Sequence, residues 1–305
     1  KARTKLPSWA ARDGIIYPPH LSMEQCSSEA TAIYKARIAG KGRRFVDLTA
    51  GFGVDAAFIA VGFQQVVTIE QQEKLCAITS ENYRVLGLDQ VEVRCGNGVE
   101  YLHTMDHADR IFIDPARRDE HGGRTYGIAD CTPNVLELRE ELLAKADRVM
   151  IKLSPMLDWR KAVEDLKAVC EVHIISVDNE CKELLLILSN EAKPLQVLCV
   201  NDEQTFTFIP ASTPSFSLPA LPSSFQYLYV PNASIMKAGC FGELTGRFQI
   251  APLDKNSHLF VSDREVPDFP GRCFVIDKMT SMNKRELKEA LTDIRQANIA
   301  VRNFP

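Results

Sequence analysis

The segment VDLTAGFGVDA, residues 46–56, constrains the fold of this chain more than any other part of the sequence. An apolar, strand-like run ends at Asp47, a Gly-x-Gly pair follows at Gly51 and Gly53, and a helix-like stretch begins directly afterwards. Glycines allow a tight turn and a close approach of the backbone to a ligand, and such turns lie at the carboxyl edge of α/β sheets, where nucleotides bind. The segment therefore predicts a Rossmann-like nucleotide site.

Short apolar runs alternate with helix-like stretches from residue 45 to about residue 191. We expect strands at 45–49, 66–70, 91–95, 110–113, 149–153, 172–177 and 184–189, with helices near 54–61, 73–86, 133–146 and 159–169. Such alternation is typical of a parallel sheet covered by helices on both faces. The polar turn at 178–182 is too short for a helical crossover, so the final strands should pair antiparallel. We predict an α/β fold with a seven-stranded sheet whose last strand is antiparallel.

Shifts in composition divide the chain into four segments. Residues 1–44 carry nine Lys and Arg side chains against three acids, and Ser22 with Gln25 resembles a capping box that opens a helix to about Ala39. We expect a basic N-terminal helical extension (1–44), the sheet domain (45–193), a hairpin and Pro/Ser-rich connector (194–228) and a small α+β module (229–305). In the module we expect helices at 233–248 and 284–297 and strands at 258–262, 272–277 and 299–303. We also expect the chain to be a piece of a longer product, truncated at its C-terminus.

Charge and composition exclude several classes of protein. The chain contains no apolar run of the length that spans a membrane and no signal-peptide pattern, which favours a cytoplasmic protein. Nine cysteines without a C-x-x-C pair argue against zinc ribbons and disulfide scaffolds, and His103 with His107 lacks a partner motif, so no metal is predicted. The net charge of −4 argues against a uniformly basic nucleic-acid binder, but residues 1–44 have a net charge of +6 and can attract phosphate locally.

Polar residues also follow the ends of the other predicted strands. Glu70 ends the second strand, where an acid can accept hydrogen bonds from ribose hydroxyls, and Asn97 after the third strand can bind an adenine edge. Asp114 follows the fourth strand and is a candidate proton acceptor or orienting group. Arg117 and Arg118 can bind phosphate bidentately or pair with neighbouring acids in a solvated loop, and both interpretations stay open.

In order and spacing, these residues resemble the motifs of class I S-adenosylmethionine-dependent methyltransferases, whose sheet has seven strands with the last antiparallel. The run DLTAGFGVDA is similar to motif I of bacterial rRNA guanine-N2 methyltransferases. A closer resemblance, over nearly the full chain, is to a bacterial methyltransferase family with a C-terminal THUMP-like domain, and THUMP domains are RNA-binding modules of tRNA-modifying enzymes. The segments that carry it are QCSSE (25–29), DPARRD (114–119), KLSPMLD (152–158), YVPNA (229–233), VPDFPGR (266–272) and VRNFP (301–305).

The resemblance implies S-adenosylmethionine as cofactor, a THUMP-like or ferredoxin-like C-terminal module, RNA (tRNA or rRNA) as partner, and a role for each matching residue. The methionine and ribose end of the cofactor would contact Asp47, Thr49, Gly51 and Gly53, while Glu70 would bind the ribose hydroxyls and Asn97 the adenine. The methyl acceptor would lie beside Asp114 and Pro115, arranged with the help of Lys152 or Asp158. Lys152 can equally be a structural ion-pair partner.

Two departures from the family motifs bear on the chemistry. Thr49 replaces the first glycine of the usual Asp-x-Gly-x-Gly-x-Gly run, and the sequence after the fourth strand is Asp-Pro-Ala-Arg instead of Asp/Asn-Pro-Pro-aromatic, which weakens the case for amino-group methylation. Covalent C5 methylation of a pyrimidine needs a Cys nucleophile, and Cys131, in an expected loop, is a poor candidate. We therefore expect direct, non-covalent methyl transfer to a nucleoside of tRNA or rRNA.

Two other functions fit parts of the sequence. The run Gly51-x-Gly53-x-x-Ala56 also matches the fingerprint of NAD-dependent oxidoreductases, although Asp47 before the turn, the Asp-Pro pair and the antiparallel final strands argue against that class. A cofactor-binding RNA-interaction protein whose catalytic edge has decayed is the non-enzymatic alternative.

Overall fold

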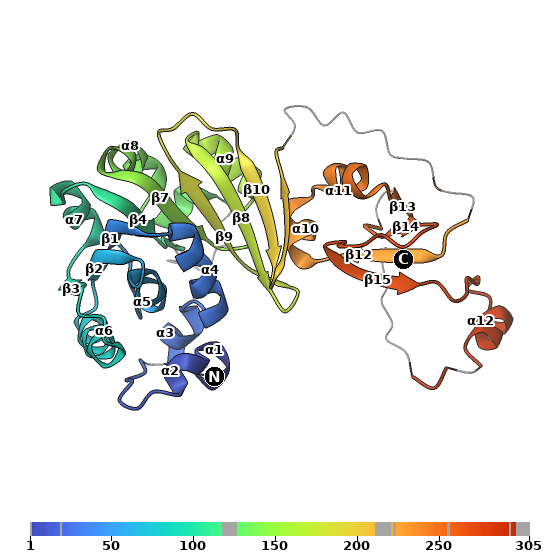
Figure 1. Ribbon diagram of the computed structural model, residues 1–305, viewed down its shortest axis with the longest axis horizontal. Helices are drawn as coiled ribbons and strands as arrows, with labels where there is room; N and C mark the ends of the chain where they lie inside the picture. The colour runs from blue at the N-terminus through green and yellow to red at the C-terminus, as the bar shows by residue number, and fades with distance from the viewer. Residues whose placement is uncertain are drawn as a thin grey trace.

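The computed structural model describes residues 2–18, 20–117, 127–210, 221, 224–254, 257–292 and 294–296. Within these residues the largest element is a nine-stranded sheet with the order β11-β10-β8-β9-β7-β4-β1-β2-β3 (Figure 1). Its strands are β1 (Gly42–Asp47), β2 (Phe63–Glu70), β3 (Val91–Cys95), β4 (Ala108–Ile113), β7 (Ala146–Leu153), β8 (Val169–Val177), β9 (Glu180–Leu188), β10 (Gln196–Asn201) and β11 (Gln204–Phe208).

The pairing of these strands confirms the predicted mixed sheet. Strands β3, β2, β1, β4 and β7 are parallel, and β9 is antiparallel to both β7 and β8. The sheet is larger than the seven strands expected, because the hairpin predicted for the connector joins it: β10 pairs parallel with β8, and β11 pairs antiparallel with β10. The edge of β8 offers unpaired backbone groups that the hairpin satisfies.

Helices cover both faces of the sheet, as predicted (Figure 1). One apolar core lies between the sheet and the N-terminal helices with α5 and α6, and the other lies against α7, α8 and α9. The helices are α1 (Ala2–Lys5), α2 (Pro7–Ala10), α3 (His20–Gln25), α4 (Glu29–Ala39), α5 (Val54–Ala60), α6 (Glu73–Leu86), α7 (Gly98–Thr104), α8 (Val135–Lys145) and α9 (Trp159–Leu166). A short pair, β5 (Ala116–Arg117) and β6 (Cys131–Thr132), and a 3-10 turn, η1 (Ile128–Asp130), follow β4.

The single helix predicted from Ser22 to about Ala39 is wrong, because the chain breaks between α3 and α4. Ser28, not Ser22, caps the longer helix: its backbone is extended and its side chain accepts a hydrogen bond from the backbone N of Thr31. Ser27 beside it points inward and donates its hydroxyl to Asp55 at 2.7 Å. The break therefore places a buried side chain that a continuous helix could not place.

A smaller antiparallel sheet follows, with the order β13-β14-β12-β15. Its strands are β12 (Tyr227–Pro231), β13 (Ala251–Pro252), β14 (Phe260–Ser262) and β15 (Gly271–Val275), with helices α10 (Ala233–Ala238), α11 (Phe241–Phe248) and α12 (Lys284–Ala290). The one helix expected at 233–248 is divided at Gly239, whose positive φ ends α10. The helix expected to reach residue 297 ends at Ala290, and the strand expected at 299–303 lies outside the described residues.

Candidate functional site

The turn after β1 and the end of β2 are bound to each other. The backbone N of Gly51 donates to Oε2 of Glu70 at 2.9 Å, and Oε1 of the same carboxylate accepts from the backbone N of Gln72 at 2.8 Å. A Cβ added to Gly51 would meet nothing within 4 Å. The turn therefore leaves open space beside a fixed carboxylate at the carboxyl edge of the sheet.

Gly53 is constrained by its own backbone conformation and by the side chain of Tyr83. Its φ is +74°, and an added Cβ would lie 2.2 Å from Oη of Tyr83, which donates to the Gly53 carbonyl at 3.0 Å. Burial raises the pKa of Tyr83 well above its ordinary value, and the neighbouring Asp47 adds to the rise, so the phenol stays a donor. Only glycine fits here, and the helix α5 begins at the next residue.

Thr49, at the position where the family motif has a glycine, ties two strand ends together. Its hydroxyl oxygen accepts a hydrogen bond of 2.7 Å from the backbone N of Asp114, and its own backbone N donates to Oδ1 of Asp47 at 2.9 Å. Asp47 is 1% exposed, and burial raises the pKa of its carboxyl well above the usual range, with further raising by Asp55 and Asp114. Thr49, which replaces the glycine of the motif, therefore connects the end of β1 to Asp114, the residue that follows β4.

Asp114 and Lys152 form an ion pair between the ends of β4 and β7. Burial by itself lowers the pKa of Lys152, but the carboxylates of Asp114, Asp55 and Glu183 together raise it above its ordinary value, so the ammonium group stays charged. Pro115 is buried beside Asp114. The contact with Asp114 therefore fits both interpretations of Lys152, as a structural ion-pair partner and as a residue that helps to arrange the methyl acceptor.

The structure does not test the roles predicted for Asn97, Arg117 and Arg118. Asn97 is exposed and its Oδ1 accepts from the backbone N of Val99 at 2.8 Å, which caps α7, so its role toward adenine stays a prediction. The backbone of Arg117 pairs with Cys131 between β5 and β6, and Arg118 lies outside the described residues. Binding of phosphate by these two arginines also stays a prediction.

Sequence reasoning missed a buried ionic cluster behind this edge. Lys35 of α4 is 0% exposed, and its Nζ lies 2.5 Å from Oε1 of Glu183, 3.0 Å from Oγ of Ser27 and 3.1 Å from Oδ1 of Asp55. A signal existed: Lys35 falls on the same helix face as Thr31, Ala32 and Ala39, which are all buried. A lysine within an apolar stripe indicates a buried ion pair.

The N-terminal segment packs over the glycine turn. Trp9 and Tyr17 contact Phe52, which lies between the two glycines, with ring centroids 5.2 and 6.3 Å away. Nζ of Lys5 donates to the carbonyls of Met23 and Glu24 at 3.0 and 2.7 Å. Because Lys5 and Lys35 are both used in internal contacts, the charge of +6 overstates how many cations this segment presents to a partner.

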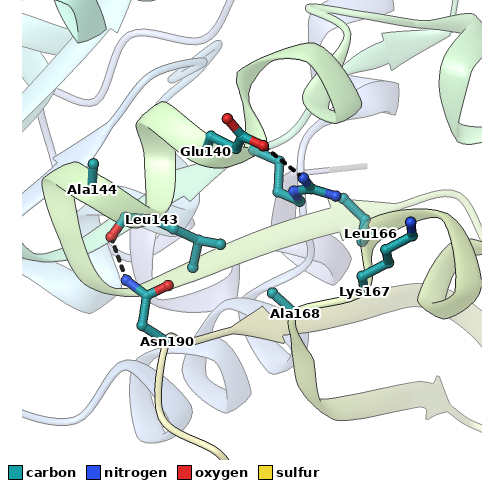
Figure 2. A pocket seen from close by; sticks show the side chains of 8 residues that line it. Glu140, Leu143, Ala144, Leu166, Lys167, Ala168 and Asn190 are labelled. Atoms are coloured by element: carbon teal, nitrogen blue, oxygen red, sulfur yellow. Dashed lines mark hydrogen bonds and ion pairs between the residues drawn. The ribbon is translucent and has the colours of Figure 1, made fainter.

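A pocket of about 390 Å³ lies elsewhere, between the end of α8 and the end of α9 (Figure 2). Figure 2 shows Asn190, whose Nδ2 donates to the Leu143 carbonyl at 2.9 Å, and the side chains of Glu140 and Lys167 at its rim. The parallel strands β7 and β8 begin on this side, so the pocket is at the edge opposite the glycine turn. None of the site residues predicted from the sequence lines this pocket.

Across the described residues, no three His, Cys, Asp or Glu side chains are arranged to hold a metal ion. None of the described helices has the length and apolar character needed to cross a membrane.

Two parts of the chain match known families. Residues 22–119 match the protein-L-isoaspartate(D-aspartate) O-methyltransferase family, and residues 227–270 match a ferredoxin-like domain. Among curated proteins, none matches this chain. The first region contains strands β1–β4 of the large sheet, and the second contains strands β12–β14 of the small sheet.

Solved structures extend the comparison to the full chain. A protein from Porphyromonas gingivalis W83, described as a candidate methyltransferase, is 34% identical, covers 100% of this chain and 78% of its own, and superposes with a TM-score of 0.91. An rRNA methylase from Streptococcus thermophilus is 18% identical over 57% of this chain and 97% of its own, with a TM-score of 0.37. TrmK of M. capricolum, solved with S-adenosylhomocysteine, is 12% identical over 57% and 70%, with a TM-score of 0.42. These last two similarities are too low to carry an argument.

Proposed function

Because this chain belongs to the methyltransferase family of the Porphyromonas gingivalis protein, with a Rossmann-like sheet and a ferredoxin-like module, we propose that it methylates a nucleoside of structured RNA by direct, non-covalent transfer. The cofactor of this methyltransferase is S-adenosylmethionine. The observation that carries the proposal is the Asp114–Lys152 pair, bound through Thr49 to the strand that leads into the glycine turn.

The residues at this edge fit S-adenosylmethionine. The open space at Gly51 lies beside Glu70, a carboxylate able to accept from ribose hydroxyls. The carboxylates of Asp55, Asp114 and Glu183 outnumber the ammonium groups of Lys35 and Lys152, and an acidic surplus favours a positively charged sulfonium. We assign Gly51, Gly53 and Glu70 to the cofactor.

Methyl transfer requires alignment of the acceptor and removal of one proton. The cofactor supplies a methyl group already activated by the sulfonium. Asp114, about one-third exposed, is available to accept the proton, and Lys152 holds its carboxylate in place. Cys131 is 1% exposed, which supports transfer without a cysteine nucleophile.

The loop after β7 supports RNA as the acceptor. Met156 is 80% exposed in this loop, four residues after Lys152, and the exposed Arg160 lies 4.3 Å over the ring of Trp159. RNA-binding proteins stack unpaired bases on aromatic rings and on Arg guanidinium planes. Arg160 is thus available for a stacking contact, and Met156 adds an exposed apolar surface.

The substitution Asp114→Asn tests the catalytic assignment. We expect transfer of labelled methyl groups to total RNA from a strain lacking the gene to fall about 10²-fold or more, because the proton acceptor is lost. The dissociation constant for S-adenosylhomocysteine, measured by calorimetry, should change less than threefold. Asp109→Asn is the matched control, since Asp109 lies at the other end of β4 and accepts from the backbone of Arg44. Full turnover by Asp114→Asn would remove Asp114 from the mechanism.

The same labelled reaction tests RNA as the substrate. Incorporation into the tRNA or rRNA fraction is expected, and mass mapping of the nucleosides then identifies the atom that is methylated. Incorporation only into protein or small molecules contradicts RNA as the substrate.

A further inference from the structure

Lys152 lies within the field of three carboxylates, of which it binds one. Asp114 forms the ion pair. Lys152 lies opposite Leu185 in the β7–β9 pair, so Glu183, two residues away on β9, is on the same face of the sheet. Asp55 shares the Lys35 ammonium group with Glu183. Asp55 is the second residue of α5, directly after the glycine turn, and Glu183 comes from β9, the strand next to β7. Because three carboxylates surround the ammonium group of Lys152, its charge alone does not determine which of them it pairs with.

Lys35 removes this ambiguity. Its ammonium group contacts both Asp55 and Glu183 and reaches them from α4, whereas Asp114 follows β4. Ser27 donates to Oδ2 of Asp55 at 2.7 Å, which holds that carboxylate toward Lys35. Two cations and three anions can then pair without competition, because each carboxylate has a defined partner.

We propose that Lys35 is a positioning residue of the methyl-transfer site: by pairing with Asp55 and Glu183, it leaves Lys152 to Asp114. This inference rests on the proposed role of the Asp114–Lys152 pair. It also makes α4, which composition assigns to a separate basic extension, a part of the site. Without the Lys35 ammonium, Lys152 moves toward the two carboxylates that have lost their partner, and Asp114 loses its fixed orientation.

The variant Lys35→Met keeps the length and apolar stem of the side chain and removes its charge. We expect kcat for methyl transfer to total RNA from the gene-deficient strain to fall at least tenfold, with a change in KM for S-adenosylmethionine below threefold. The double variant Lys35→Met with Glu183→Gln removes one cation and one anion, so it should recover kcat to within threefold of the wild type. A double variant that falls as far as the single one overturns the proposal.

Arg148→Met is the matched control. Arg148 lies at the other end of β7 from Lys152 and forms an ion pair with Glu171 on β8. Its loss removes a half-buried ion pair from the same strand, so kcat of the folded variant should stay within twofold of the wild type. An equal loss of kcat in Arg148→Met and Lys35→Met would mean that Lys35 stabilises the fold and does not position the Asp114–Lys152 pair.

A measurement without any acceptor separates this proposal from the proposed function. Lysine ammonium groups labelled with ¹⁵N give resolved signals when buried and ion-paired, and Lys152→Arg assigns the signal of Lys152. We expect this signal to shift or vanish in Lys35→Met and to return in the double variant. An unchanged signal in a folded Lys35→Met protein overturns the proposal even if RNA proves to be the substrate. If Lys35→Met does not fold, a folded double variant with restored signal and kcat supports charge balance, and one lacking the signal contradicts it.

Discussion

Gly53 is the residue at which backbone strain and packing act together. Its φ of +74° disfavours any side chain, and a Cβ would overlap the hydroxyl of Tyr83. We expect Gly53→Ala to lower the affinity for S-adenosylhomocysteine at least tenfold and to destabilise the fold by about 2–3 kcal/mol, since overpacking adds to strain. Calorimetric titration and urea unfolding measure the two effects.

Gly87→Ala is the control for strain alone. Gly87 has a φ of +71° at the end of α6, and a Cβ there would meet nothing within 4 Å. It should lose about 1 kcal/mol of stability and keep its cofactor affinity. Equal affinities in Gly53→Ala and the wild type would contradict the close fit of the turn.

Glu171 gives the fold a defined pH dependence. The hydrogen bond from His173 and the Arg148 guanidinium lower the pKa of Glu171 to about 2, against the opposing effect of burial. A carboxyl whose pKa is lower in the folded state adds stability above its unfolded pKa of about 4.5, and this contribution is lost as pH falls toward 2. The charged pair with Arg148 is therefore a stabilising contact at neutral pH.

The variant Glu171→Gln measures this contribution. We expect a loss of about 1–2 kcal/mol at pH 6, because water partly screens this half-buried pair, and the loss should shrink steadily between pH 4.5 and pH 2. Urea unfolding of both proteins across this range provides the comparison. A difference that stays constant with pH would mean that packing, and not ionisation, accounts for the effect.

At the scale of elements, α1 and α2 are too short to be helical on their own. Four residues each, they are held by Leu6 and Trp9, both buried in the core that also contains Phe52. We expect Trp9→Ala to destabilise the protein by about 3–5 kcal/mol, because the cavity left behind cannot be filled by a helix with no stability of its own. Denaturant unfolding monitors the loss.

Ser8→Ala is the neighbouring control in α2. The Ser8 hydroxyl donates to Glu29 at 2.8 Å but is exposed, so its loss should cost about 1 kcal/mol or less. Similar losses in the two variants would contradict an N-terminal segment held by its apolar contacts.

Element boundaries were predictable where local chemistry decides them. The helices expected to begin at 54, 73 and 159 begin there as α5, α6 and α9. Helix α7 and the end of α10 were missed, although Asn97 caps the first and Gly239 ends the second through local contacts. The break before α4 was not predictable, because Ser27 leaves the helix for a contact with Asp55, 28 positions along the chain. Local propensity contains no information on such a partner.

At the scale of the whole molecule, the C-terminal module is packed onto the large sheet. Nε1 of the buried Trp159 donates to the Ala238 carbonyl at 3.3 Å, Asn179 accepts from the backbone of Ala233, and Arg247 lies 5.3 Å over the ring of Phe206. One apolar core includes residues of both parts, such as Trp159 and Ile235. We expect the two parts to unfold together in a single calorimetric transition.

Trp159→Phe tests this coupling. It retains most of the apolar contact and removes the donor to α10, so it should cost about 1–2 kcal/mol and lower the midpoint of the whole transition. Arg160→Ala, which removes an exposed guanidinium from the same ring, should cost less than about 1 kcal/mol. A variant that unfolds in two separate steps would show that the module depends on this hydrogen bond for docking.

Adjacent residues in the chain determined the strand–turn–helix unit at residues 46–56, the alternation that leads to a parallel sheet, and the polar residues at strand ends. These features follow from periodicity and turn chemistry, which act over a few residues. Parallel strands end at one edge, so the proximity of Asp47, Glu70 and Asp114 was also implied. The family resemblance added the cofactor.

Only the tertiary structure decided which side chains pair. Lys35, Asp55 and Glu183 come from α4, α5 and β9, and nothing in the spacing of 35, 55 and 183 links them. It also decided that Thr49 holds Asp114, that the hairpin β10–β11 extends the sheet, and that Lys5 binds inside the N-terminal segment. The physical reason is that burial removes water as a partner, so a charge or donor must find a group wherever the packed chain brings one within reach.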